Sequence, residues 1–223
     1  MDESLSAKGT LRLVAGSTFK KDKDAILMAV SQDGCSLECA SQEMRADKDV
    51  VLHAVIRNGY ALQFASRDLQ ADKDIVLCAV SENAFTLSYA SEALKSDKEI
   101  VLCAVSQNGD ALQFASREMR ADKEIVLCAV SQNGNLLRYA GEIPKADKEI
   151  VLCAVSQHGY SLQYANRNLR ADKEVVLSAV SNDGYAWRYA SRALKADKDV
   201  ISAISQNKDV SAILQIPHDW NDE

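Results

Sequence analysis

The sequence predicts an all-α fold, an α-solenoid of about eight 25-residue helix-turn-helix repeats. Three observations predict it. An Asp-Lys pair recurs every 25 residues. Each pair opens an apolar run, which is followed after a turn by apolar residues at helical spacing. Only two prolines occur in the chain, so little interrupts these helices. The pairs begin at Asp22, Asp47, Asp72, Asp97, Asp122, Asp147, Asp172 and Asp197.

The segment 97–121 illustrates the first helix of each repeat. Asp97 is a good N-cap because its carboxylate can accept from the free amides of the first turn, and Glu99 adds negative charge at the positive end of the helix dipole. The apolar run 100–105 is typical of a helix packed on several sides, although a buried strand fits the same run. The Asp cap, the helical pattern that follows and the lack of proline favour the helix. Gly109 is expected to end it as an αL residue.

A second helix is expected from about Asp110 to Arg120. Its apolar residues fall near the i, i+3, i+4, i+7 pattern, which predicts one buried stripe and one solvated face. These residues are Ala111, Leu112, Phe114, Ala115 and Met119. Two such short helices bury too little apolar surface to fold alone, so each repeat has to stack on its neighbours.

We interpret residues 1–223 as a single repeat domain. Residues 22–196 hold seven full repeats. Residues 1–21 are expected to form an N-terminal partial repeat that caps the stack, and residues 197–216 a C-terminal one, followed by a polar tail at 217–223. The N-terminal unit has helical spacing at Leu11, Val14, Ala15 and Phe19.

Composition and charge argue against several function classes. The chain has 26 Lys plus Arg against 32 Asp plus Glu, and the net charge of −6 disfavours nucleic acid as a partner. The longest apolar runs have six residues, far fewer than the ~20 needed to span a bilayer, so no membrane partner is expected. The first ten residues carry acids and no apolar core, so no secretory signal is expected and an intracellular, cytoplasmic location is favoured. Six free thiols agree with a reducing compartment.

Four cysteines occupy the same position in successive repeats: Cys78, Cys103, Cys128 and Cys153. A ladder of thiols or metal ions is one interpretation. Zinc, however, needs four ligands at ~2.3 Å from one ion, and thiols in successive repeats are expected ~9 to 10 Å apart. Buried, reduced thiols that act as small hydrophobes are the better interpretation. No metal site and no cofactor are predicted.

Aromatic residues form a second column, on the second helices. They are Phe64, Tyr89, Phe114, Tyr139, Tyr164 and Tyr189. We expect them to fill the core between repeats. The alternative, a ladder on which nucleic-acid bases stack, would need exposed rings in a basic groove.

Cations form a third column near the end of the second helices, at Arg67, Arg117, Arg167 and Arg192. Each lies three residues before a further long polar residue, so the two should share one face. Acids interrupt this stripe, and Asp-Lys-Asp or Asp-Lys-Glu triplets lie nearby. A solvated edge with many salt bridges is therefore favoured over a surface that tracks phosphates.

Aromatic residues also stand directly after the turn between the two helices. Exposed aromatic side chains often dominate protein interfaces. The alternative is that these rings fold over the neighbouring repeat. If a partner binds, the first candidates to contact it are Tyr60, Phe85, Tyr160 and Tyr185.

The repeat 122–146 departs from the pattern. Gly141 stands where serine is usual, and Pro144 replaces a leucine or methionine. Proline removes an amide and disfavours helix before it, so the second helix is expected to end early here. We also expect a local change of solenoid curvature.

Catalytic constellations are missing from the sequence. The three histidines, His53, His158 and His218, are scattered, and no nucleophile-elbow, zinc-protease, Walker or dinucleotide motif occurs. An enzyme on this scaffold would need an inserted loop, and none breaks the repetition. The sequence therefore predicts no catalytic residues and no enzymatic activity.

The recurring pattern D-K-E-I-V-L-x-A-V-S-x-N-G-x-A-L-x-Y/F-A-S resembles the tandem units of the family called domain of unknown function 4116, over about residues 22–207. Proteins with such units occur in unicellular eukaryotes, large DNA viruses and some intracellular bacteria. The resemblance implies no catalytic residues. It does imply a bacterial effector or viral host-interaction factor as one role, in which case the protein would act in the host cytosol.

These observations favour a non-enzymatic, monomeric helical scaffold that binds a protein or peptide partner inside the cell. The alternative function is a nucleic-acid-binding solenoid that uses the Arg/Lys edge of the second helices.

Overall fold

The computed structural model describes residues 22–206, in two compact units, Met1–Met119 (unit 1) and Arg120–Glu223 (unit 2). The predicted N-terminal partial repeat and the end of the C-terminal one, with the polar tail, lie outside the described residues. Every regular element in the described range is a helix, and the same order of elements recurs every 25 residues. The predicted all-α solenoid is confirmed. None of the described helices has the length and apolarity needed to cross a membrane.

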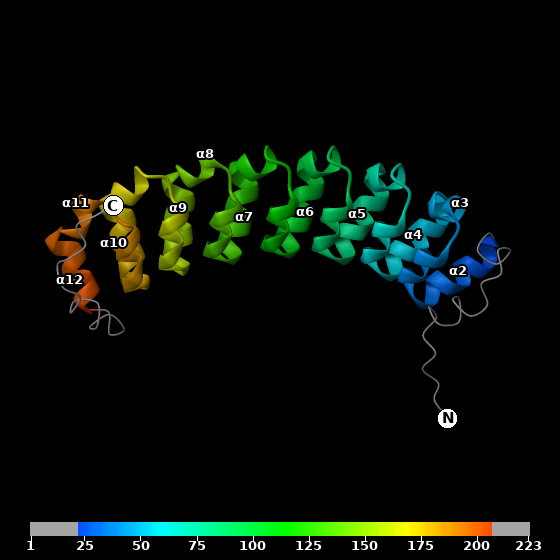
Figure 1. Ribbon diagram of the computed structural model, residues 1–223, viewed down its shortest axis with the longest axis horizontal. Coiled ribbons are helices and arrows are strands. Elements are labelled where there is room, and N and C mark those ends of the chain that lie inside the picture. Colours follow the sequence, from blue (N-terminus) through cyan, green and yellow to red (C-terminus); the bar gives the residue numbers. More distant parts are fainter. Residues whose placement is uncertain (1–21, 207–223) are drawn as a thin grey trace, which may run out of the picture. The chain divides into compact units, whose positions relative to one another are not determined.

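Unit 1 contains four long α-helices, α2 (Lys23–Gln32), α4 (Lys48–Arg57), α5 (Lys73–Glu82) and α6 (Lys98–Gln107), each packed against the next (Figure 1). Each is followed by a 3₁₀ helix, η2 (Gly34–Cys39), η3 (Gly59–Phe64), η5 (Ala84–Tyr89) or η7 (Gly109–Phe114). A single turn completes the repeat, α3 (Gln42–Arg45), η4 (Leu69–Ala71) or η6 (Leu94–Ser96), while η8 (Met119–Ala121) crosses the unit boundary.

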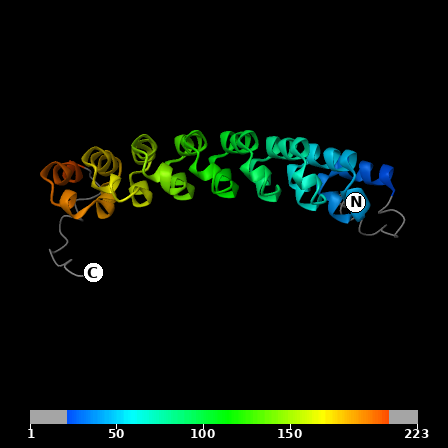
Figure 2. The ribbon, with the colours of Figure 1, turned by 90° about the horizontal axis from the view of Figure 1, so that it is seen from above.

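Unit 2 repeats this order. Its long helices are α7 (Lys123–Gln132), α9 (Lys148–Gln157), α10 (Lys173–Asn182) and α12 (Lys198–Gln206). The 3₁₀ helices are η9 (Gly134–Tyr139), η10 (Gly159–Tyr164) and η12 (Gly184–Tyr189). The closing turns are α8 (Glu142–Lys145), η11 (Leu169–Ala171) and α11 (Arg192–Lys195). Within each unit the long helices form one layer and the 3₁₀ helices a second (Figure 2).

The long helices begin where the sequence predicts. Asp97 caps α6, and its carboxylate accepts from the backbone amides of Glu99 at 3.0 Å and Ile100 at 3.2 Å. The aspartate at the equivalent position of the other repeats caps α2, α4, α5, α7, α9 and α10. An unpaired amide at a helix start would otherwise be left to water, so these caps fix the first residue of each helix.

The prediction of a single second helix from Asp110 to Arg120 is wrong. The chain forms the 3₁₀ helix η7 and then becomes extended at Ala115 (φ −68°, ψ 153°). This break leaves the amide of Ser116 free of the helix, and it donates to the carbonyl oxygen of Lys95 in the preceding repeat at 3.0 Å. Equivalent bonds at 2.7 to 2.9 Å occur at Ser66, Ser91, Gly141, Asn166 and Ser191. A backbone bond to the neighbouring repeat thus replaces a bond within the second helix.

The prediction that Gly109 ends the first helix as an αL residue is also wrong. The first helix ends at Gln107, Asn108 is extended (φ −150°, ψ 112°), and Gly109 opens η7. Glycine serves close packing at this position instead. A Cβ atom on Gly59 would lie 2.6 Å from the carbonyl oxygen of Ala79 in the next repeat. Repeats therefore touch backbone to backbone here.

Pro144 is buried at the third position of the one-turn helix α8. The early end of the second helix that Pro144 predicts does occur, but α3 and α11 are equally short without proline. The short turn is thus a property of the repeat and not of this residue. The expected change of curvature stays a prediction.

The core lies between the two layers. Each long helix buries an inward face, which in α6 consists of Ile100, Val101, Ala104 and Val105. The 3₁₀ helix that follows adds Ala111 and Leu112, both fully buried. The other face of the long helix stays partly open to solvent, so the prediction of packing on several sides is correct only for the inward face.

Candidate functional site

The four candidate aromatic residues lie near the start of the 3₁₀ helices. A polar side chain caps the 3₁₀ helices of Tyr60, Phe85 and Tyr185 and bonds the amide of the aromatic residue, whereas no side chain caps η10, which carries Tyr160. Asn58 Oδ1 accepts from the amide of Tyr60 at 3.0 Å, and Asp183 Oδ1 accepts from that of Tyr185 at 2.9 Å. At Tyr160 the neighbouring repeat supplies the bond instead, because Asn182 Oδ1 accepts from the amide of Gly159 at 2.7 Å.

Three of the four rings pack edge-to-face on the second-column aromatic residue of the next repeat. The ring centroids are 6.4 Å apart for Tyr60 and Tyr89, with an interplanar angle of 75°. Phe85 and Phe114 are 6.1 Å apart at 86°, and Tyr160 and Tyr189 are 5.0 Å apart at 89°. Such pairs prefer this geometry because the positive edge of one ring meets the negative face of the other.

Exposure separates the candidates by unit. Tyr60 and Phe85 in unit 1 are half-buried within their ring pairs. Tyr160 and Tyr185 in unit 2 each expose 44% of their surface. Unit 2 thus presents two accessible aromatic side chains at equivalent positions of successive repeats, whereas the unit 1 rings mainly hold repeats together.

One member of the aromatic pair in unit 2, Tyr189, has a raised pKa. Burial, followed by hydrogen bonding with Tyr160, raises the pKa of Tyr189 to about 12, while nearby Arg188 acts in the opposite direction. Tyr189 therefore stays neutral at physiological pH. The second-column aromatic residues are half-buried rather than fully enclosed, so they line the edge of the core.

The basic edge of the second halves divides into two kinds of residue. The first cation of each repeat is exposed, as at Arg67, Arg117, Arg167 and Arg192. The polar residue three positions later is half-buried, and in the repeat 47–71 it turns back toward the 3₁₀ helix. Gln70 Nε2, for example, donates to the carbonyl oxygen of Leu62 at 3.1 Å. Only the first member of each pair is readily available to a partner.

One feature of this edge escaped the sequence analysis. The second halves 159–171 and 184–196 contain five cations and no acid. The cations are Arg167, Arg170, Arg188, Arg192 and Lys195. The sequence contains this excess of positive charge. Comparing one position across all repeats does not reveal it, because the excess belongs to two particular second halves near the C-terminal end of the chain.

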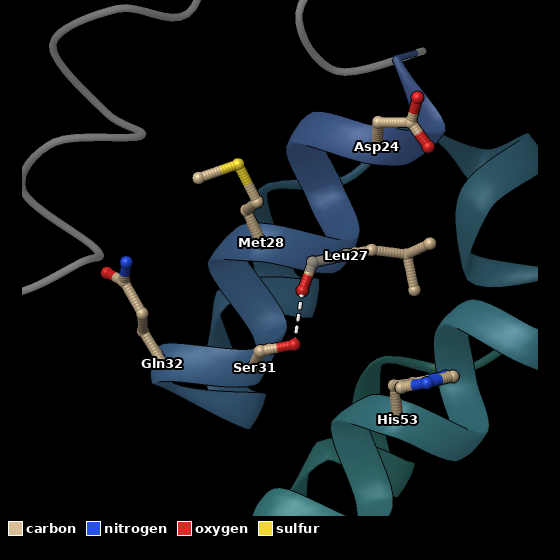
Figure 3. A pocket seen from close by; sticks show the side chains of 6 residues that line it. All are labelled: Asp24, Leu27, Met28, Ser31, Gln32 and His53. Atoms are coloured by element: carbon tan, nitrogen blue, oxygen red, sulfur yellow. Dashed lines mark hydrogen bonds between the residues drawn. The ribbon is translucent and has the colours of Figure 1, made fainter.

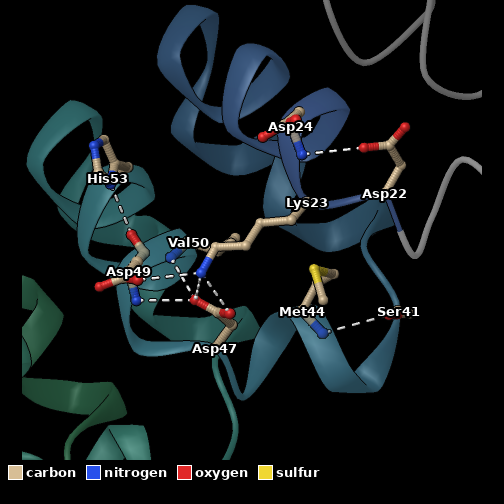
Figure 4. A network of polar contacts seen from close by, with 9 residues as sticks. All are labelled: Asp22, Lys23, Asp24, Ser41, Met44, Asp47, Asp49, Val50 and His53. Carbon is tan, nitrogen blue, oxygen red and sulfur yellow. Dashed lines mark hydrogen bonds and ion pairs between the residues drawn. The ribbon is translucent and has the colours of Figure 1, made fainter.

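A ladder of ion pairs joins the first helices of successive repeats. In unit 1, Lys23 Nζ lies 2.8 Å from Asp47 and 3.1 Å from Asp49 (Figure 4). Asp47 is at the same time the N-cap of α4. In unit 2, Lys148 binds Asp172 at 2.8 Å. These ion pairs join first helices, whereas the edge rich in salt bridges was expected along the cation column of the second helices.

The ladder shifts the titration of its members. The hydrogen bond from Lys148 is the main reason that the pKa of Asp172 lies below its ordinary value, and backbone amides of α10 add to it. The same contact raises the pKa of Lys148. The lysines are about half exposed, so solvent screens much of this attraction. The ladder therefore sets the register of neighbouring helices more than it adds stability.

The four cysteines of one column are half-buried, not fully buried as predicted. They lie on the outward side of the first helices, next to positions that are open to solvent. Gln107 Nε2 contacts Cys103 Sγ at 3.8 Å. None of the six cysteines, all of which lie in the described range, forms a disulfide, and no described group of three or more metal-binding side chains is close enough together to hold an ion.

A shallow depression on the outer face of α2 and α4 is lined by Asp24, Leu27, Met28, Ser31, Gln32 and His53 (Figure 3). Its potentially reactive groups bond to their own helices. The hydroxyl of Ser31 donates to the carbonyl oxygen of Leu27 at 2.7 Å. His53 Nδ1 lies 2.8 Å from the carbonyl oxygen of Asp49, so the proton sits on Nδ1. The depression thus does not pair the imidazole with the hydroxyl.

Comparison with known proteins gives one match. Six overlapping windows of the chain match a family described as a domain of unknown function (DUF4116), at residues 47–95, 72–120, 97–145, 122–170, 147–195 and 172–220. Each window begins at an N-cap aspartate and covers two repeats, so the family unit coincides with the structural one. Neither a curated protein nor a solved structure is significantly similar to the chain. The matched windows together span most of the sequence, and the chain belongs to the DUF4116 family.

Proposed function

We propose that this protein is a non-enzymatic repeat scaffold that binds a protein or peptide partner, with Tyr160 and Tyr185 as its main anchors. The observation that carries the proposal is the exposure of these two rings, 44% each, at the same position of consecutive repeats. Tyrosine is enriched among the residues that dominate binding energy at protein interfaces.

The backbone around the anchors supports this role. Both rings are held by short 3₁₀ helices that pack on the long helices α9 and α10. A rigid scaffold loses little conformational entropy when a partner binds. Tyr60 and Phe85 contribute less in this proposal, because they are half-buried in ring pairs.

The non-enzymatic assignment rests on regularity. From 22 to 206 each repeat keeps the same three segments with short connections, and no inserted loop brings reactive side chains together. Cysteines without disulfides among residues 22–206 favour a reducing, cytoplasmic location, either in the producing cell or in a host. We further propose that the protein acts as a monomer.

The test is site-specific photo-cross-linking in the full-length chain. The cross-linker p-benzoylphenylalanine replaces Tyr160 or Tyr185, and the products are identified from the cell extract and quantified. We expect one dominant cross-linked protein partner. In an affinity pull-down without the cross-linker, recovery of that partner should fall about tenfold with the double substitution Tyr160→Ser and Tyr185→Ser.

Ile143→Ser is the matched control, because Ile143 is an exposed apolar residue of the same unit, 74% accessible. It should leave recovery unchanged. Equal loss with Ile143→Ser would contradict the proposal, as would undiminished recovery with the tyrosine variant. Recovery of nucleic acid, with an affinity that falls steeply as salt rises, would favour the nucleic-acid-binding alternative.

A further inference from the structure

The aromatic anchors of unit 2 lie among an unusual concentration of positive charge. The second halves 159–171 and 184–196 carry five cations and no acid, although the whole chain has a net charge of −6. Every other full second half contains at least one acid, from Glu38 in the first to Glu142 in the fifth. The concentration is therefore local to η10, η11, η12 and α11.

We propose that this surface, which we call the basic face and define as Tyr160, Arg167, Tyr185, Arg188 and Arg192, binds an acidic segment of the partner protein. The inference rests on the proposed function and names the chemistry of the partner. Arginine pairs well with carboxylates because its planar guanidinium offers two parallel donors.

The cations of the basic face are available. Arg167, Arg188 and Arg192 are exposed, and none forms an ion pair with a carboxylate among residues 22–206. In contrast, two lysines of other second halves already have acidic partners. Lys95 lies 2.8 Å from Glu92, and Lys145 lies 3.8 Å from Glu142.

The acids between the two basic segments are already engaged. Asp172 and Glu174 bind Lys148 at 2.8 and 2.7 Å. Asp183 caps η12 by accepting from the amide of Tyr185. These carboxylates are therefore not free to neutralise the arginines of the basic face.

Contacts between the two repeats connect the basic segments. The amide of Ser191 donates to the carbonyl oxygen of Arg170 at 2.8 Å, which ties α11 to η11. The ring of Tyr160 lies 5.0 Å from that of Tyr189, next to Arg188. This backbone bond and this ring pair thus link the two repeats that carry the basic segments.

Lys195 plays a supporting part at the edge of the basic face. Its Nζ lies 5.5 Å from the centroid of the Trp187 ring, and Trp187 Nε1 donates to its carbonyl oxygen at 3.2 Å. Half-buried Lys195 adds positive charge to the second half that also carries Arg188 and Arg192.

An acidic polypeptide fits this surface better than nucleic acid. Base stacking needs open ring faces, whereas the Tyr160 ring meets Tyr189 at 89° and is only partly exposed. A phosphate backbone also needs an extended positive track, yet the adjoining first helices carry the acid-rich ion-pair ladder. Because the positive charge is confined to the second halves of two repeats, it matches a short acidic segment.

The test measures the anisotropy of a fluorescein-labelled peptide of alternating glutamate and tyrosine as full-length protein is added. The variant Arg167→Glu/Arg192→Glu is compared with Arg67→Glu/Arg117→Glu, which makes the same charge change at the same repeat position in unit 1. We expect the first pair to raise the Kd about tenfold or more and the second to change it less than about twofold. Circular dichroism verifies that both variants are folded.

Three results would overturn the inference. They are no binding of the peptide by the unsubstituted protein, equal weakening by both variants, and tighter binding of a single-stranded oligonucleotide of matched charge. The proposed function is judged separately, because cross-linking at Tyr160 does not depend on the partner being acidic. A cross-linked partner together with no peptide binding would reject the acidic segment alone.

Discussion

Replacing Gly59 by alanine tests the close contact between repeats. The added Cβ would lie 2.6 Å from Ala79 O, 3.2 Å from Thr86 Cγ2 and 3.3 Å from Glu82 Cβ. The first contact is with backbone, which cannot rotate away, so the two repeats have to separate by about half an ångström. Overpacking of this kind costs about 1 to 3 kcal/mol.

A compensating effect reduces this cost. Alanine restricts the unfolded chain and thereby stabilises the folded state by about 0.4 to 1 kcal/mol where the native backbone suits it. No left-handed φ opposes alanine at Gly59. We therefore expect Gly59→Ala to lower the free energy of unfolding by about 1 to 2 kcal/mol. Guanidinium titration followed by far-ultraviolet circular dichroism measures it.

Gly141→Ala is the matched control in unit 2. Its Cβ would lie 3.3 Å from Arg120 O and 3.4 Å from Ala121 Cβ, close to ordinary contact, and most repeats carry serine at this position. This variant should be neutral or more stable by up to about 1 kcal/mol. If Gly59→Ala left the unfolding midpoint unchanged, or if both variants shifted it equally, the argument from close approach would be refuted.

Three further predictions follow from the described contacts. Lys148 lowers the pKa of Asp172. Stability from this pair is therefore present above the ordinary aspartate pKa of 3.8 and is lost as the pH falls through the lower pKa of the folded state. Lys148→Met should flatten this acid dependence of the unfolding midpoint. Burial, with the charge of Glu82, raises the pKa of Cys78, so alkylation at mildly alkaline pH, followed by mass spectrometry, should be slower there than for glutathione, and a faster rate would contradict it. Tyr160→Leu should lower the free energy of unfolding by about 0.5 to 1.5 kcal/mol through loss of the ring pair, as thermal denaturation would show.

The sequence predicted the first helices well because their signals are local. An aspartate cap and the residues that it bonds lie within three positions, as at Asp97 and Ile100. Because the sequence repeats every 25 residues, a correct prediction for one first helix applies to the first helix of every repeat. Ion pairs near the Asp-Lys triplets could also be expected, because every repeat carries a lysine equivalent to Lys23 and an aspartate equivalent to Asp47.

The second half of the repeat could not be predicted in the same way. Leu112 and Ala115 are three residues apart, which fits both an α-helix and the 3₁₀ helix that forms. The choice depends on the bond from Ser116 to Lys95 in another repeat, which no local pattern reveals. The ring pair of Tyr160 and Tyr189 likewise joins residues of different repeats, so exposure of the candidate anchors required the structure.

The dependence of each repeat on its neighbours is tested most directly by a series of fragments of unit 1. Residues 22–71, 22–96 and 22–119 contain two, three and nearly four repeats, and circular dichroism with guanidinium titration gives the unfolding midpoint of each. Stacked repeats predict a largely unfolded two-repeat fragment and a midpoint that rises with every added repeat. A two-repeat fragment that is fully helical, with the same midpoint as 22–119, would contradict the account.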